Sequence, residues 1–258
     1  MNPDADAAVA DFARVLACRT PGAVAVLFYG SCRRDGTLDG LLDFYVLTEG
    51  PLSVPHRLLP PTVSFAAHGN LRAKVAVMDL PAFRRAMRPE AVSTHLWARF
   101  CQPASVAWSR DDDVAAEVAA ALADATRAAA WWCARIADGD WSVLFRHTYA
   151  AELRAEGPDR ARLLAAADRR IIPLDAVAEE DKRAARRAWA WRWRLGKVLA
   201  AARLVKAAFT AAGGADYLAW KIQRHTGRPV ELTPWQRRHP LLATPVLVPR
   251  LWRRGLIR

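Results

Sequence analysis

Cysteine is scarce in this 258-residue chain, and its four cysteines, Cys18, Cys32, Cys101 and Cys133, form no Cys-x-x-Cys pair. Structural zinc sites and disulfide-stapled secreted domains both depend on regularly spaced cysteines, so neither class of protein is expected. Scattered thiols are typical of a reducing compartment, and the sequence therefore predicts a cytoplasmic protein.

Long apolar runs are missing as well. No stretch reaches the about 18 uncharged apolar residues that a membrane-spanning helix needs, so no transmembrane helix is expected. The first residues, MNPDADAAVADF, are acidic. They lack the apolar centre of a signal peptide and the basic charge of a transit peptide, so neither targeting segment is expected.

Acidic residues are nearly absent from the last third of the chain. Residues 182–258 contain 18 Lys and Arg but two acids, whereas residues 1–181 contain 20 basic and 24 acidic residues. Six of the eleven tryptophans lie in the same basic third. The net charge of +12 therefore originates there, and it indicates an anionic partner such as a nucleotide, a nucleic acid or an anionic membrane.

The texture of the sequence changes near residue 110. Before that point, the spacing of apolar residues predicts a helix over 5–18, helical segments within 80–99 and four strands. The expected strands cover 23–29, 41–47, 71–78 and 103–108. Residues 1–110 are therefore predicted to form an α+β unit.

After residue 110 the pattern is helical. The segment opens with DDDVAAEVAAALADATRAAAWWCARIA, which is rich in alanine and has three acids in its first turn, where the helix dipole favours them. A helical part is predicted over 111–225, followed over 226–258 by a basic tail that contains Trp and is interrupted by Pro.

Residues 28–47, FYGSCRRDGTLDGLLDFYVL, place a Gly-Ser pair after one expected strand and an aspartate inside the next. Gly30 permits a phosphate to approach the backbone, and Ser31 can donate a hydrogen bond to it. Asp43 can hold a divalent metal that bridges the same phosphates. The pattern is typical of polymerase-β-like nucleotidyltransferases, although Leu41 occupies the position of their other strand carboxylate.

Three further acids are candidates for a second metal ligand: Asp39, Glu49 and Asp79. Asp39 has the strand parity of Asp43, but it lies four residues away and could share a metal only if the chain bends at Gly40. A plain structural interpretation stays open, because Gly-Ser turns are common between strands and a lone strand aspartate can cap a neighbouring turn.

An ordered series of motifs resembles the mitochondrial-type phosphatidate cytidylyltransferases, the translocator-maintenance family, which is a branch of those nucleotidyltransferases. The series covers most of the chain and consists of YGSC (29–32), LLDFYVL (41–47), GPLSVPH (50–56), GNLRAKVAVMDL (69–80), LWARFCQPASV (96–106), WSVLFRHTYAAELRAEGPDRARLL (141–164) and GKVLAAARLVKAAFTAAGG (196–214). Cys32 stands where the family has a second glycine, and the gap before Asp43 is shorter than in the family.

The resemblance implies an α+β fold in which a polymerase-β-like nucleotidyltransferase domain, a mixed sheet with flanking helices, precedes a mostly helical C-terminal domain and the basic tail. It also implies an activity in phospholipid biosynthesis. A bacterial homologue of this family would transfer the cytidylyl group of CTP to phosphatidate, with Mg²⁺ or Mn²⁺, to give CDP-diacylglycerol and pyrophosphate.

The same resemblance suggests roles for individual residues. Gly30, Ser31 and Lys74 would hold the triphosphate, and Lys74 aligns with a lysine of the family. Asp43 would bind the metal and position the phosphatidate phosphate for in-line attack. Such a transfer depends mainly on positioning and charge neutralisation.

Three further cations match basic positions of the family, and the resemblance suggests that Arg146, Arg203 and Lys206 contact the substrate phosphate. A plain interpretation as surface or snorkelling side chains applies to each of them, and to Lys74. His147, next to Arg146, is interpreted as a packing residue.

Residues 182–209, KRAARRAWAWRWRLGKVLAAARLVKAAF, combine Arg with Trp over several helical turns, and 245–258 repeat the theme. Both suit an anionic membrane surface, so a protein peripheral on the inner face of the membrane is predicted. For residues 182–209 the alternative is a bundle helix with a Trp-lined core face. For the protein as a whole the alternatives are a nucleotidyltransferase with another acceptor and a non-catalytic homologue, which Leu41 and Cys32 favour. Nucleic-acid binding is disfavoured because no recognisable module is present.

Overall fold

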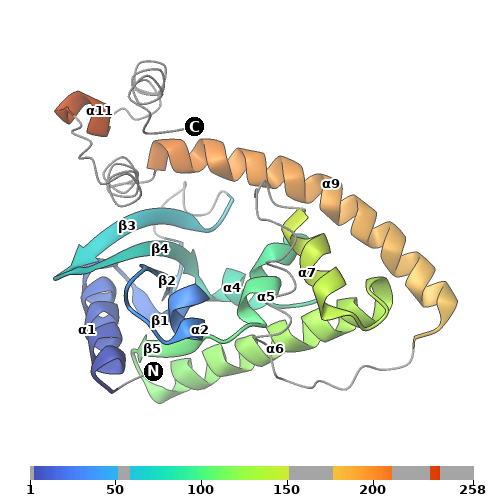
Figure 1. The fold of residues 1–258 in the computed structure, drawn as a ribbon, viewed down its shortest axis with the longest axis horizontal. Coiled ribbons are helices and arrows are strands. Elements are labelled where there is room, and N and C mark those ends of the chain that lie inside the picture. The colour runs from blue at the N-terminus through green and yellow to red at the C-terminus, as the bar shows by residue number, and fades with distance from the viewer. Residues whose placement is uncertain (1–2, 52–58, 151–176, 211–232, 239–258) are drawn as a thin grey trace.

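The computed structural model describes residues 3–51, 59–150, 177–210 and 233–238 (Figure 1). The strands in these ranges are β1 (Ala23–Tyr29), β2 (Leu41–Thr48), β3 (Thr62–His68), β4 (Leu71–Asp79) and β5 (Ser105–Ser109). The helices are α1 (Pro3–Arg19), α2 (Gly30–Asp35), α4 (Leu80–Ala86), α5 (Thr94–Phe100), α6 (Asp112–Ile136), α7 (Trp141–Ala150), α9 (Glu179–Thr210) and α11 (Pro234–Arg238).

The strands form one mixed sheet in the order β3-β4-β2-β1-β5. β2 and β4 are parallel, and the other neighbouring pairs are antiparallel. β2 and β4 are both inner strands, which explains why each is mostly apolar and has buried side chains on either face. The α+β fold class with a mixed sheet and flanking helices is confirmed.

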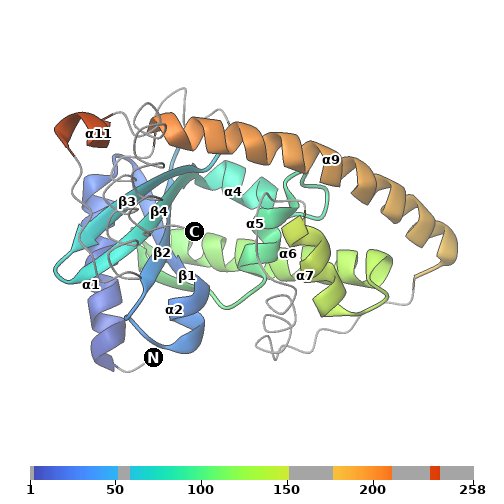
Figure 2. The same cartoon turned by 45° about the horizontal axis from the view of Figure 1, so that its top comes forward.

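The two faces of the sheet carry separate apolar cores. On one face, α1 packs Phe12 and Leu16 onto Phe28 and Phe44 of the inner strands. On the other face, α4, α5 and α6 cover Leu27, Tyr45 and Leu47 (Figure 2). Because strand side chains alternate between the faces, the second face also receives the odd-numbered residues of β2, Asp43 among them.

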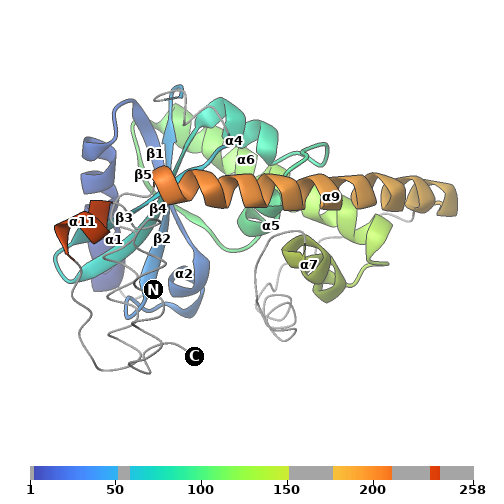
Figure 3. The ribbon, with the colours of Figure 1, turned by 90° about the horizontal axis from the view of Figure 1, so that it is seen from above.

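The helical half of the chain continues the core of the sheet without a break in packing. One connected apolar core includes Leu47 of β2, Val118 of α6, Phe145 of α7 and Trp189 of α9. α9 extends from α6 and α7 at its start to β3 at its end (Figure 3). The described residues on both sides of position 110 therefore contribute to one core, from β1 through Trp189 of α9. The division of the chain near residue 110 stays a prediction. Most of the predicted tail 226–258 lies outside the described residues.

All four predicted strands and the predicted helices over 5–18, 80–99 and 111–136 are confirmed. Three elements of the described ranges were missed, one of them the short helix α11 in the predicted tail. Residues 30–35, interpreted as a turn, form the short helix α2, which ends at Gly36 in the left-handed conformation (φ 69°). β3 escaped detection because two prolines precede it and two alanines stand where a strand pattern needs large apolar residues.

The amphipathic segment 182–209 lies within α9, and its first half packs as a bundle helix. Trp189 is 6% exposed and contacts the Trp132 ring of α6 at a centroid distance of 4.9 Å. Trp191, on another side of the helix, is 56% exposed. No helix in the described ranges combines the length and the apolarity that crossing a bilayer requires.

The four thiols differ in accessibility, which gives a direct test of the packing. Cys18 is exposed, whereas Cys32, Cys101 and Cys133 are buried. Burial raises the pKa of the Cys133 thiol to about 12 and, together with the Asp43 carboxylate, raises that of Cys32. At about pH 8, iodoacetamide is expected to modify Cys18 rapidly and the buried thiols only after denaturation, because the thiolate is the reactive form.

Peptide mass spectrometry of a labelling time course measures this order, and Cys18→Ser should remove the fast phase. Rapid labelling of Cys32 or Cys133 in the folded protein would contradict the packing.

Candidate active site

The Asp43 side chain lies directly against Gly30. Asp43 pairs with Tyr29 across the antiparallel β1–β2 ladder, and Gly30 follows Tyr29 with a φ of +87°. A Cβ on Gly30 would come within 3.1 Å of both Cβ and Cγ of Asp43, and closer still to its Oδ2. The carboxylate therefore occupies the space that the missing side chain leaves open, at the point where β1 turns into α2.

Lys74 is the neighbour of Asp43 on the other side. The two residues are Cα partners in the parallel β2–β4 pair, so their side chains emerge from the same face of the sheet, about 4.8 Å apart at the backbone. Both are half-buried. The structure thus brings three of the predicted site residues, Gly30, Asp43 and Lys74, together at one end of the central strands. Their predicted roles stay predictions.

Arg99 adds a cation that sequence reasoning missed. Its guanidinium carbon lies 5.8 Å from the centroid of the Tyr29 ring, and Tyr29 directly precedes Gly30 in the sequence. The only local signal was a basic residue between the aromatic residues of α5, Trp97 and Phe100. Without knowledge of how α5 packs on the sheet, nothing in the sequence places that arginine near Asp43.

Tyr45 lies two residues beyond Asp43 on the same face and is fully buried. Burial raises the pKa of the Tyr45 phenol far above its ordinary value, and the charges of Arg99 and Arg203 act in the opposite direction. Two arginines, one on α5 and one on α9, therefore direct positive charge toward this face of the sheet.

Cys32, which replaces a glycine of the resembling family, is accommodated by a second glycine. Its side chain is buried, and its thiol lies 3.5 Å from the carbonyl oxygen of Leu41. A Cβ on Gly40 would lie 2.8 Å from the Cys32 sulfur. The bare backbone at Gly40 thus leaves room for the thiol, and the approach of Asp43 to Gly30 is retained.

Gly40→Ala is expected to destabilise the protein by about 1–3 kcal/mol through overpacking against the thiol. Cys32→Ala should relieve that clash, so the double variant should be more stable than the sum of the single effects by about 1 kcal/mol. Urea unfolding measures each free energy. Gly50→Ala, which meets no atom within 4 Å, serves as the control. Strict additivity of the two changes would contradict the packing.

Two of the three candidate second carboxylates lie far from Asp43. Asp79 and Glu49 lie at or beyond the far ends of β4 and β2, about 15–20 Å along the strands from the Asp43 end. Asp79 caps α4 by accepting a hydrogen bond from Ala82, and Glu49 pairs with Arg110. Asp39 is exposed in the connection before β2 and accepts a hydrogen bond from the Thr37 hydroxyl.

Of the three predicted phosphate contacts, Arg203 and Lys206 lie together near the start of β3, whereas Arg146 lies apart on α7. Arg203 donates to the Pro60 carbonyl and, at 2.7 Å, to the Ser93 hydroxyl, while Lys206 donates to the Leu59 carbonyl. Both residues therefore fasten α9 to the start of β3. Burial and the charge of Arg203 lower the pKa of Lys206. Arg146 is exposed on α7, where its charge acts on Asp140 and His147.

The residues around Asp43 fit a divalent metal held mainly by its substrate. No three His, Cys, Asp or Glu side chains gather into a metal cluster within the described ranges. Mg²⁺ typically takes one or two protein carboxylates and completes its shell with water and phosphate oxygens. Asp43 supplies one such carboxylate next to Gly30, and a single protein carboxylate suits a metal–nucleotide complex better than a permanently bound ion.

Comparison with known proteins gives limited similarity. No protein-family model matches the chain, and no curated protein matches it. Among solved structures, the chain is similar to a nucleotidyltransferase-like protein from Exiguobacterium sibiricum 255-15, at 15% identity and a TM-score of 0.31, over 98% of this chain and 92% of that chain. At this TM-score the similarity carries no argument about function. The argument about function rests on the geometry of the site.

The chemistry available at this site is that of a polyanion in contact with a metal. The backbone at Gly30 can approach a phosphate, Ser31 offers a hydroxyl, and Lys74 and Arg99 supply positive charge. Asp43 is the one acid in this group and is the natural ligand for a cation that the polyanion brings. Together these groups can position and neutralise a phosphate chain, which is the main requirement of phosphoryl and nucleotidyl transfer.

Proposed function

We propose that the protein is a nucleotidyltransferase whose active site is formed by Gly30, Ser31, Asp43 and Lys74. The observation that carries this proposal is the contact of the Asp43 carboxylate with the bare backbone of Gly30. An aspartate that served only to cap a turn would not require a glycine with a positive φ beneath it.

Each residue has a defined role in this proposal. The backbone at Gly30 and the Ser31 hydroxyl bind the triphosphate, and Lys74 neutralises part of its charge. Asp43 would hold Mg²⁺, which when bound supplies charge stabilisation at the α-phosphate and the departing pyrophosphate. Through the bound ion, Asp43 would also orient the acceptor phosphate, whose oxygen would bond to the α-phosphorus as the bond from that phosphorus to the departing pyrophosphate breaks.

In its finer form, the proposal names CTP as the nucleotide and phosphatidate in an anionic membrane as the acceptor, with CDP-diacylglycerol and pyrophosphate as products. The support is the ordered series of family-like motifs and the basic, Trp-containing C-terminal third. Part of that third is α9, which exposes Trp191, Arg187 and Arg194. Such a surface would bring a peripheral protein to its lipid substrate.

The test is a product assay with the purified protein, Mg²⁺, liposomes that contain phosphatidate, and each of the four radiolabelled nucleoside triphosphates in turn. Labelled lipid formed from CTP alone supports the finer proposal. Nucleotide transfer to another added acceptor, such as tRNA or a sugar phosphate, supports nucleotidyl transfer but refutes the lipid acceptor.

The competing function is that of a non-catalytic homologue, which the presence of Leu41 beside a lone strand carboxylate favours. It predicts that no nucleotide-dependent product forms with any acceptor, while CTP still binds in a filter or calorimetric assay. That result would refute nucleotidyl transfer.

A further inference from the structure

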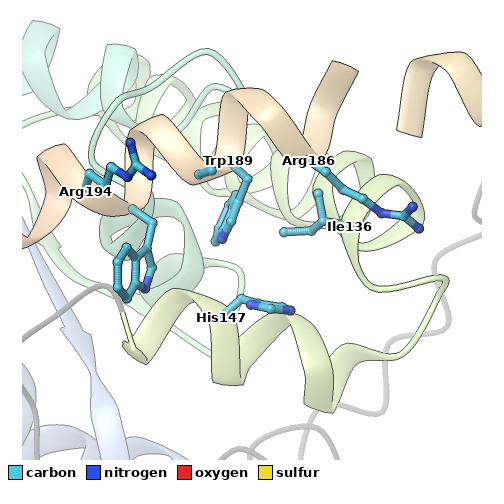
Figure 4. A pocket seen from close by; sticks show the side chains of 7 residues that line it. Ile136, His147, Arg186, Trp189 and Arg194 are labelled. Carbon is cyan, nitrogen blue, oxygen red and sulfur yellow. The ribbon is translucent and has the colours of Figure 1, made fainter. Parts of the chain in front are cut away.

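A groove lies between α7 and α9, on the side of α9 that faces α6 and α7. It encloses about 620 Å³, within the range of small-molecule sites in proteins. Figure 4 shows its lining, which comes from the end of α6, one residue of α7 and two turns of α9: Ile136, His147, Arg186, Trp189, Ala190, Trp193 and Arg194.

The floor of the groove is apolar and held in place by the core. Trp189 is 6% exposed, and its ring packs against Trp132 and Trp97 at centroid distances of 4.9 and 6.3 Å. Lys197 covers one face of the Trp193 ring at 3.8 Å. Because both rings are fixed by these contacts, an apolar ligand would find a surface that is already formed, at little cost in ordering.

The rim is cationic. Arg186 is half exposed, and its guanidinium lies 3.6 Å from Asp138, outside the lining. Arg194 is exposed and makes no hydrogen bond or ion pair with another residue of the described part of the chain. Partial burial and the charge of Arg146 lower the pKa of His147, which disfavours the charged form of its imidazole. Among the described residues that line the groove, none has an acidic or amide side chain.

We propose that this groove binds an amphiphile that has an alkyl chain and an anionic head group. An alkyl chain requires no hydrogen bonds and can lie along the indole rings and Ile136, where each buried methylene contributes about 0.8 kcal/mol. An anionic head requires donors alone, and Arg194 carries five N–H groups at the exposed rim. A nucleobase fits less well, because its own donors would meet no carboxylate or amide acceptor.

This binding site is separate from the Gly30–Asp43 site, since its residues come from α6, α7 and α9 and include none from β1 or β2. The inference therefore does not depend on nucleotidyl transfer. If the protein does act on a lipid phosphate, the groove offers a place for the apolar part of that substrate or of a bound membrane lipid.

Isothermal titration calorimetry with the full-length protein, at about 0.15 M salt to screen remote charges, tests the proposal. The probe is decyl phosphate at concentrations below micelle formation. Inorganic phosphate, which has the anionic head without a chain, and decyl maltoside, which has the chain with an uncharged head, are the comparison ligands. Decyl phosphate is expected to bind at least about tenfold more tightly than either of them.

Two variants in the groove have matched controls on the same helix. Ala190→Trp fills the groove at an exposed position and should weaken decyl phosphate binding by about tenfold or more, whereas Ala184→Trp, outside the lining, should not. Arg194→Glu should weaken it by roughly fivefold to tenfold, and Arg187→Glu by less than about twofold. Asp43→Asn should leave this binding unchanged.

Unaltered binding by Ala190→Trp would overturn the proposal, as would equal losses in the groove variants and their controls. Binding of inorganic phosphate as tight as that of decyl phosphate would also overturn it, because that result would describe an anion site without a place for a chain. An inactive protein that still binds decyl phosphate in this pattern would refute the proposed transfer and leave the groove assignment standing.

Discussion

Replacing Asp43 with asparagine is expected to lower the rate of nucleotidyl transfer by about 10³-fold while the fold is retained. The amide has the same shape as the carboxylate, so the contact with Gly30 persists, but the negative charge that would hold a divalent metal is lost. Removing one preorganised electrostatic contact from an active site commonly costs 10²–10³ in rate, about 2.7–4 kcal/mol. Here the loss also weakens metal binding. Initial rates at saturating CTP and Mg²⁺ measure the effect.

Asp39→Asn is the matched control, since Asp39 is exposed in the connection before β2 and bonds with Thr37. Its rate should stay within about twofold of the parent, because surface changes away from a site have small effects. Circular dichroism and a urea titration show whether each variant is folded. A folded Asp43→Asn protein with the parent's rate would refute the assignment of Asp43 as the metal ligand.

Gly30→Ala is expected to cost both stability and activity. A non-glycine residue at a φ of +87° is strained, and the new Cβ would collide with the Asp43 carboxylate. Strain of this kind costs about 1–3 kcal/mol, to which the displacement of Asp43 adds. We expect the free energy of unfolding to fall by about 2–4 kcal/mol. The rate of transfer should fall by about 10²-fold, because the metal ligand has moved.

Gly22→Ala distinguishes backbone strain from the collision with Asp43 as the cause of the losses expected for Gly30→Ala. Gly22 also has a positive φ, +66°, but a Cβ there would meet no atom within 4 Å. It should therefore lose about 1 kcal/mol from backbone strain and keep the parent's activity. Equal losses of activity in the two variants would show that strain, rather than contact with Asp43, explains the effect at Gly30.

The elements with strong local patterns were predictable from sequence. β1, β2 and β4 are apolar runs bounded by turn-forming residues, and α6 begins with three acids and continues as an alanine-rich helix. α2 was not predictable, because its residues, GSCRRD, favour turns as strongly as a helical turn. Its six residues form a helix only where the strand before it and the chain after it fix both ends.

The prediction for the candidate site was partly local and partly a matter of packing. Gly30 and Asp43 are joined by a short connection between antiparallel strands, so their proximity follows from the strand pattern. The positions of Glu49 and Asp79 were not anticipated in the same way. Each was a plausible ligand on sequence distance, yet its strand runs away from Asp43 and carries it to the far ends of β2 and β4.

By itself, the sequence determined which segments are strands and helices, the concentration of positive charge in the last third, and the placement of one acid beside one glycine. Only the tertiary structure decided that Lys74 stands next to Asp43, that Arg99 faces Tyr29, and that Trp189 and Trp193 border a groove. The physical reason is the distance along the chain over which each interaction acts. Periodicity and turn chemistry act over a few residues, whereas strand pairing and helix docking are decided by burial of the whole apolar surface at once.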